Sequence, residues 1–132
     1  MDYYLAGRFG ARDKLRDIRD RITLHRSVAS WLDVAAREED VRDSGGRYIG
    51  AVCREYAQCD LRDIAACDVF VLVDDGEPSS GGRHVELGYA LALGKHVVRV
   101  GPGSNIFAAS LPDVSLETVE ECLSYLACGF TF

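Results

Sequence analysis

Short apolar runs alternate along the chain with longer segments in which apolar residues recur at helical spacing. The run from Val69 to Val73 is continuous and rich in β-branched residues, which is typical of a strand buried on both faces of a parallel sheet. Further strands are predicted at residues 3–6, 28–32, 96–100 and 113–116. This order, with short connections, predicts a single α/β domain over residues 1–132, built on a doubly wound, five-stranded parallel sheet, because crossovers between parallel strands are right-handed.

Helical spacing is found in the segment after the first strand and in residues 49–67, 84–94 and 118–127. In residues 49–67 the inward positions are expected to be Val52, Tyr56, Cys59 and Ile64. Asp60 interrupts this segment, and it either caps a short final helix from Leu61 to Cys67 or faces a site as a carboxylate. Residues 33–47 show no clear periodicity and predict a surface excursion or a loop over a site.

The carboxyl edge of the predicted sheet is where open α/β folds bind ligands. The first loop at this edge holds Gly7 and Gly10 ahead of a helix start, together with Arg8 and Arg12. Backbone N–H groups at a helix start and guanidinium groups both favour an anion such as a 5'-phosphate. The alternative is that the two arginines are solvated surface charges.

Glu86 stands near the start of a predicted helix that follows a Gly- and Ser-rich loop. In the first turn of a helix, unpaired N–H groups and the positive end of the helix dipole favour an ionised carboxylate. An ionised carboxylate beside such a loop suits a carboxylate nucleophile. The alternative is that Glu86 only stabilises the helix start.

Size and charge narrow the classes of function. The chain has 132 residues, 48% of them hydrophobic, which suits one domain with a core, and no apolar run approaches the roughly 20 residues that cross a membrane. A net charge of -6 argues against binding polymeric DNA or RNA, although a single nucleotide needs few cations. We therefore expect a cytoplasmic protein that acts on a small molecule and has no membrane partner.

No motif in the sequence points to a metal or a cofactor. The five cysteines are odd in number and lack the close pairs of zinc sites, so they are expected to be small core residues in a reducing compartment. His84-Val85-Glu86 has the H-x-E form of zinc deaminases, but the P-C-x-x-C segment is missing. Neither a dinucleotide fingerprint, a P-loop nor a serine-hydrolase elbow occurs.

Four segments, taken together and in this order, resemble the nucleoside 2-deoxyribosyltransferase superfamily. They are Tyr4 to Gly7, Asp60-Leu61 ahead of Cys67 to Val71, Ser79 to Ala90, and Gly101 to Phe107. The most specific part is Glu86 to Ala90, which reads Glu-Leu-Gly-Tyr-Ala after a Ser/Gly loop. The resemblance implies a flavodoxin-like sheet and cleavage of the N-glycosidic bond of a deoxynucleoside or nucleotide.

The resemblance also implies roles for individual residues. Glu86 would be the nucleophile at C1' of the sugar, Asp60 would position the sugar or help to protonate the departing base, and Tyr4 would contact the nucleophile or the sugar. Departure of the base leaves an oxocarbenium-like sugar, which a carboxylate can stabilise or capture. The candidate substrate-binding residues are Gly7, Arg8, Gly10, Arg12, Ser79, Ser80, Gly82 and Asn105.

Three functions follow from these residues. The leading hypothesis is an N-deoxyribosyltransferase of free nucleosides that needs no cofactor. The alternative is an N-hydrolase of (deoxy)nucleoside 5'-monophosphates; relatives of that kind bind phosphate through serines and the first loop, where this chain has Arg8 in place of an expected serine. The third is a non-catalytic nucleotide-binding module. Because the superfamily is often oligomeric, a homodimer or higher homo-oligomer is expected.

Overall fold

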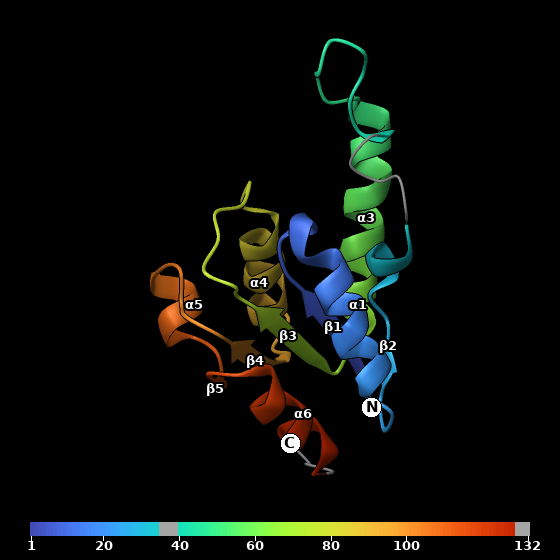
Figure 1. Ribbon diagram of the computed structural model, residues 1–132. Helices are drawn as coiled ribbons and strands as arrows, with labels where there is room; N and C mark the ends of the chain where they lie inside the picture. Colours follow the sequence, from blue (N-terminus) through green and yellow to red (C-terminus); the bar gives the residue numbers. More distant parts are fainter. Residues whose placement is uncertain (35–39, 129–132) are drawn as a thin grey trace.

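A computed structural model describes residues 1–34 and 40–128, which form an α/β fold around five parallel strands (Figure 1). The strands stand in the order β2-β1-β3-β4-β5. Their bounds are Asp2–Ala6 for β1, Arg26–Ser27 for β2, Val69–Val73 for β3, His96–Val100 for β4 and Val114–Leu116 for β5. This is the doubly wound, flavodoxin-like sheet that was predicted, so the fold class is confirmed.

Helices cover both faces of the sheet. Helix α1 contacts α6, and α3 contacts α4, which gives one pair for each face (Figure 1). The helices are α1 (Arg12–Arg21), α3 (Gly50–Ala66), α4 (Gly82–Ala92), α5 (Ile106–Ser110) and α6 (Val119–Ala127), with short 3-10 helices η1 (Phe9–Ala11) and η2 (Ser30–Asp33). Within the described ranges, none of these helices is both long and apolar enough to cross a membrane.

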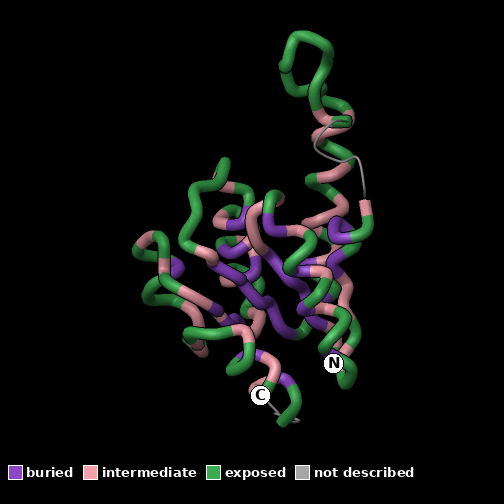
Figure 2. Tube along the Cα trace, in the orientation of Figure 1, coloured by how far each residue is buried: buried purple, intermediate pink, exposed green. Residues whose placement is uncertain are grey.

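The two central strands lie in the core. Every residue of β3 and all but the first residue of β1 are buried. Tyr4 of β1 is paired in register with Phe70 of β3, and their rings are stacked with centroids 5.7 Å apart. Figure 2 shows the buried trace following the sheet, while the loops are largely exposed. Burial on both faces explains why these strands are apolar at successive positions, and it sets the carboxyl ends of β1 and β3 side by side.

The prediction of a strand at residues 28–32 is wrong. Strand β2 ends before this run, and residues 30–32 of the run lie in η2. The amide and the hydroxyl of Ser30 both donate to the Asp63 carboxylate, at 3.0 and 2.6 Å, which turns the chain at this point. Trp31 is buried all the same, and its indole N–H donates to the Leu5 carbonyl at 2.9 Å. A short apolar run can enter the core through a tight turn as well as through a strand, and periodicity does not separate the two.

Helix α3 is continuous, so Asp60 lies within it and does not cap a shorter helix. Of the positions expected to face inward, only Ile64 is buried, while Val52, Tyr56 and Cys59 are half-buried. The N-terminal part of α3 extends beyond the sheet (Figure 1). This part of the helix therefore has less of the core to pack against.

Candidate active site

A cavity of about 270 Å³ opens at the carboxyl edge of the sheet, beside the ends of β1 and β3. In this strand order the winding of the chain reverses between those two strands, and open α/β sheets bind ligands at such a point. Segments that are distant in the sequence meet here. The lining residues are Gly7, Arg8, Phe9, Trp31, Tyr48, Asp60, Ser79, Ser80, Gly82, Arg83 and Glu86.

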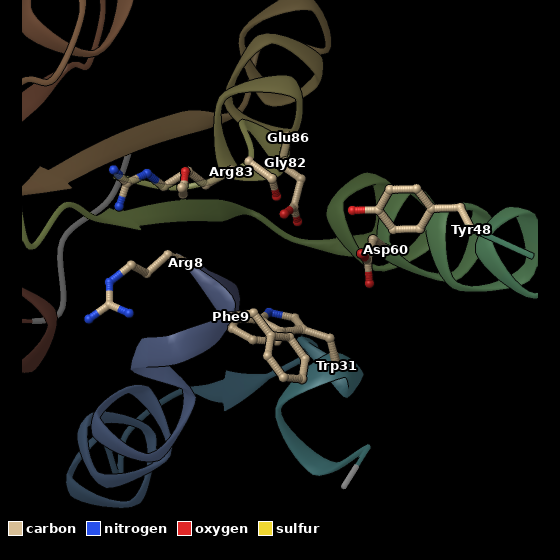
Figure 3. A pocket seen from close by; sticks show the side chains of 11 residues that line it. Arg8, Phe9, Trp31, Tyr48, Asp60, Gly82, Arg83 and Glu86 are labelled. Atoms are coloured by element: carbon tan, nitrogen blue, oxygen red, sulfur yellow. The ribbon is translucent and has the colours of Figure 1, made fainter. Parts of the chain in front are cut away.

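Glu86 and Tyr4 meet at this cavity although 82 positions separate them. The Tyr4 hydroxyl donates a hydrogen bond to the Glu86 carboxylate. Because Tyr4 is buried and stacked on Phe70, its hydroxyl is held in one place. Figure 3 shows the Glu86 carboxylate pointing from α4 into the cavity. The structure thus brings two of the predicted catalytic residues together, while their roles stay predictions.

The position of Glu86 in its helix differs from the prediction. Helix α4 begins at Gly82, so Glu86 is its fifth residue and lies beyond the first turn. Gly81 adopts a left-handed conformation (φ +97°) that favours glycine, and its carbonyl accepts a hydrogen bond from the His84 amide at 3.0 Å. The prediction that free N–H groups of the first turn hold the Glu86 carboxylate is therefore wrong. The Tyr4 hydroxyl of β1 donates a hydrogen bond to this carboxylate instead.

Asp60 reaches the same cavity from α3. In Figure 3, Asp60 and Tyr48 stand at one end of the cavity, the guanidinium groups of Arg8 and Arg83 stand at the other, and Glu86 lies between them. Two carboxylates that face one small cavity can divide the work of glycosyl transfer, one acting at the sugar carbon and the other moving a proton.

At the arginine end of the cavity, aspartate side chains neutralise the positive charge. The Arg83 side chain is only 2% exposed, and its guanidinium lies 3.7 Å from Asp74 and 3.5 Å from Asp75. It also donates to the Glu77 carbonyl at 2.9 Å. Arg8 donates through Nε to Asp75 at 2.7 Å. Two cations thus face two anions, and these four side chains leave no surplus formal charge for a phosphate.

Asp74 and Asp75 connect the loops around the site. Asp74 accepts hydrogen bonds from the Ser104 amide, at 3.0 Å, and from the Ser104 hydroxyl, which ties the loop after β3 to the loop after β4. Burial acts to raise the pKa of Asp75, but hydrogen bonds from the Glu77 amide and from Arg8 outweigh it and hold that pKa below its ordinary value of 3.8. Both acids therefore act as part of the scaffold of the cavity.

The predicted substrate-binding residues divide into two groups. Those that line the cavity are Gly7, Arg8, Ser79, Ser80 and Gly82. Within the described residues, Gly10, Arg12 and Asn105 are not part of the lining. Arg12 instead donates to the Val34 carbonyl at 2.5 Å, and the Asn105 side chain caps the N-terminus of α5. The structure therefore does not bring these three residues into the cavity.

Sequence reasoning missed the aromatic lining residues Phe9, Trp31 and Tyr48 and the buried Arg83. The aromatic residues come from three separate segments, and no spacing relates them. Arg83 lies inside the Ser79–Ala90 segment, so its place in that motif was the available signal. In the part of the chain that the structure describes, no group of three His, Cys, Asp or Glu side chains is placed to hold a metal ion.

The fold and the site define a flavodoxin-like α/β protein with a carboxylate-lined cavity at the β1/β3 edge. No protein-family model matches the chain, and no curated protein sequence does. Solved structures do match it over nearly its whole length. A 2-deoxyribosyltransferase from Bacillus psychrosaccharolyticus is similar with a TM-score of 0.68 at 18% identity, over 100% of this chain and 93% of that one.

Two further structures share the fold. The Clostridium botulinum CMP N-glycosidase BcmB has a TM-score of 0.59 at 18% identity, over 96% of this chain and 99% of that one. A conserved protein from Enterococcus faecalis V583 has a TM-score of 0.67 at 17% identity, over 96% and 97% of the two chains. At these identities the likeness shows the fold alone, and that fold is the flavodoxin-like sheet predicted from the sequence.

Proposed function

We propose that the protein cleaves the N-glycosidic bond of a nucleoside and transfers the deoxyribosyl group to a second base, with Glu86 as the nucleophile. The observation that carries this proposal is the Glu86 carboxylate, which lines the cavity and accepts a hydrogen bond from buried Tyr4. The fold neighbours named as a 2-deoxyribosyltransferase and a CMP N-glycosidase support the same class of chemistry.

In the first half-reaction, a carboxylate oxygen of Glu86 bonds to C1' while the bond from C1' to the base nitrogen breaks. The bonding electrons leave with the base, which takes up a proton. The Asp60 carboxyl group, at the Tyr48 end of the cavity, is the donor of that proton. The Tyr4 hydroxyl orients the attacking carboxylate and thereby reduces the entropy cost of the attack.

In the second half-reaction, a nitrogen of the second base bonds to C1' and the ester between Glu86 and C1' breaks. The Glu86 carboxylate is released, and the proton of the incoming base passes to Asp60. Water in place of the second base would give the free sugar instead, by the same route. The same residues therefore serve a transferase or a hydrolase, and access of water to the ester decides between them.

A nucleoside 5'-monophosphate is the second candidate substrate. Ser79, Ser80 and Gly82 at the start of α4 line the cavity, and hydroxyl groups and helix-start amides favour an anion. The neighbouring Arg8 and Arg83 already face two aspartates. A phosphate would therefore rely on the hydroxyl and amide donors more than on free cations.

The first prediction concerns Glu86. The Glu86→Gln variant is expected to fold and to lose about a thousandfold or more in kcat, because an amide cannot form the glycosyl ester. Glu77→Gln, an exposed glutamate in the loop before α4, is the matched control and should keep the rate. The measurement is base release followed by chromatography. An unchanged rate in Glu86→Gln would contradict the mechanism.

Mass spectrometry of the intact protein provides a direct test of the covalent route. A 2'-fluoro-2'-deoxynucleoside should slow the second half-reaction and add the mass of its sugar to the unchanged protein. Peptide mapping should then place that mass on Glu86, and the Glu86→Gln variant should gain none.

Product analysis separates the candidate functions. A deoxynucleoside incubated with a different free base gives a new nucleoside if the protein is a transferase. A monophosphate incubated alone gives free base and sugar phosphate if the protein is a hydrolase. Binding of nucleosides that is the same in the unchanged protein and in Glu86→Gln, with no base released by either, would identify a non-catalytic binding module.

A further inference from the structure

A hairpin before α3 brings Tyr48 to the cavity. In this segment, here called the 41–49 hairpin, Arg42 and Tyr48 pair as an antiparallel bridge. At the turn, the Asp43 carboxylate accepts hydrogen bonds from two backbone amides at 2.9 and 3.0 Å. These contacts lie within the hairpin, so they set the path of its backbone without help from the sheet.

Arg42 holds the ring of Tyr48. Its guanidinium carbon lies 4.1 Å from the centre of the Tyr48 ring, and its Nη2 donates to the Tyr48 hydroxyl at 2.7 Å. Tyr48 is 60% exposed, so it contributes little to the core. An exposed aromatic ring that is held in a fixed orientation and lines a cavity is suited to contact a ligand, because stacking requires an oriented ring.

Phe9 and Trp31 form the facing side of the cavity. Their ring centroids are 6.1 Å apart. Trp31 is fixed by its hydrogen bond to the Leu5 carbonyl. Figure 3 shows both rings across the cavity from Tyr48, whose hydroxyl end points toward the middle. Aromatic side chains thus lie on two sides of the cavity, which suits contact with a flat ring.

We propose that Tyr48 is a substrate-binding residue that stacks on the base of the bound nucleoside, and that Arg42 is a positioning residue that holds its ring. This inference rests on the proposed function insofar as the ligand is a nucleoside or nucleotide. Every base has a π-face, so an aromatic ring can stack on any of them. The Tyr48 ring therefore contributes to the affinity for the substrate more than to the selectivity between bases. The 41–49 hairpin is therefore part of the substrate site, although its sequence showed no periodicity.

The test is calorimetric binding in the Glu86→Gln protein, so that no turnover interferes. The probes are the common 2'-deoxynucleosides and their 5'-monophosphates. Tyr48→Ala is expected to weaken binding about ten- to a hundredfold, as loss of base–aromatic stacking does. Tyr48→Phe keeps the ring and should bind nearly as well as the parent. Tyr48 is exposed, and melting temperatures verify that both variants fold.

Matched variants separate positioning from general disturbance. Arg42→Ala should weaken binding and Arg42→Lys should restore part of it, whereas Arg47→Ala removes the same charge from the same hairpin and should change nothing. If Arg42 acts through Tyr48, adding Arg42→Ala to Tyr48→Ala should cause no further loss, because the two substitutions are then coupled.

Each outcome decides the inference. Unchanged affinity in Tyr48→Ala would overturn it, and so would an equal loss in Tyr48→Phe, which would assign the effect to the hydroxyl. If the unchanged protein binds these probes without releasing base and Tyr48→Ala weakens the binding, the proposed reaction fails but the role of Tyr48 stands. If none of the probes binds, both fail.

Discussion

Tyr3 and Tyr4 are neighbours in β1, and their side chains point to opposite faces of the sheet because successive residues of a strand alternate. The Tyr4 hydroxyl meets the Glu86 carboxylate at the cavity. The Tyr3 hydroxyl is buried and has no hydrogen-bond partner in the described part of the chain. Two adjacent and chemically identical side chains therefore differ in what their hydroxyl groups can do.

A prediction at the scale of residues follows from this difference. Tyr4→Phe is expected to lower kcat about 10- to 100-fold, because a hydrogen bond to a charged group contributes about 1.5–3 kcal/mol and here would orient the proposed nucleophile. Tyr3→Phe removes the same atom from the next residue and should leave kcat unchanged. Steady-state rates of base release measure both. An equal loss in the two variants would argue against a role for the Tyr4 hydroxyl.

At the scale of elements, buried charges connect α4 to the end of β3. Arg83 is the second residue of α4, and Asp74 follows β3 directly. Their side chains are 2% and 0% exposed. Because α4 also carries Glu86, the pair helps to determine where the nucleophile candidate stands relative to β1.

Loss of the Arg83 charge should destabilise the protein. Arg83→Met leaves Asp74 buried without its counter-charge, and breaking such a pair costs about 3–5 kcal/mol. Since the two Ser104 hydrogen bonds to Asp74 persist, we expect the lower end, about 3 kcal/mol. Arg54→Met, an exposed position on α3, is the control and should stay within about 0.5 kcal/mol. Urea unfolding measures both, and an unchanged midpoint for Arg83→Met would contradict the inference.

At the scale of the whole molecule, three buried groups are expected to lower the free energy of unfolding at alkaline pH. Burial raises the pKa of Tyr3 from 10.0 to about 12 and the pKa values of Cys67 and Cys122 from 9.0 to about 11. Below pH 9 all three are neutral in both the folded and the unfolded chain. As the pH rises further, the unfolded chain loses these protons first, so ionisation favours unfolding.

From about pH 7 to 8.5 the free energy of unfolding should therefore be level, and at higher pH it should fall. Between about pH 9 and 11 each buried thiol contributes a loss of about 1.4 kcal/mol per pH unit. Cys122→Ala should reduce this slope, whereas Cys128→Ala, at an exposed position, should not. Urea unfolding at pH 8, 9.5 and 10.5 measures the effect. Stability that stays level over this range would show that the thiols are not protected by the fold.

The oligomeric state and the cellular location also concern the whole molecule. The homodimer or higher homo-oligomer and the cytoplasmic location stay predictions, and light scattering of the purified protein measures the first of them.

A continuous apolar run was sufficient to place β3 at its observed bounds, because burial on both faces requires an unbroken run. Strand β4 was also placed at its observed bounds, although His96 and Arg99 interrupt its apolar residues. The same signal failed for the second strand, where hydrogen bonds from Ser30 to the Asp63 carboxylate turn the chain. It also misplaced the start of α4, because the helix begins after the left-handed Gly81, and periodicity of apolar residues does not report that conformation.

The sequence by itself determined most of the alternation of strands and helices, the edge of the sheet that carries the cavity, and, with the help of the resemblance, Glu86 as the nucleophile candidate. Each of these depends on residues close together in the chain or on a rule of topology. Only the tertiary structure decided which side chains share the cavity, including the contact of Tyr4 with Glu86 and the facing aromatic walls. Those contacts join distant segments, and they depend on strand register and helix packing that local patterns do not specify.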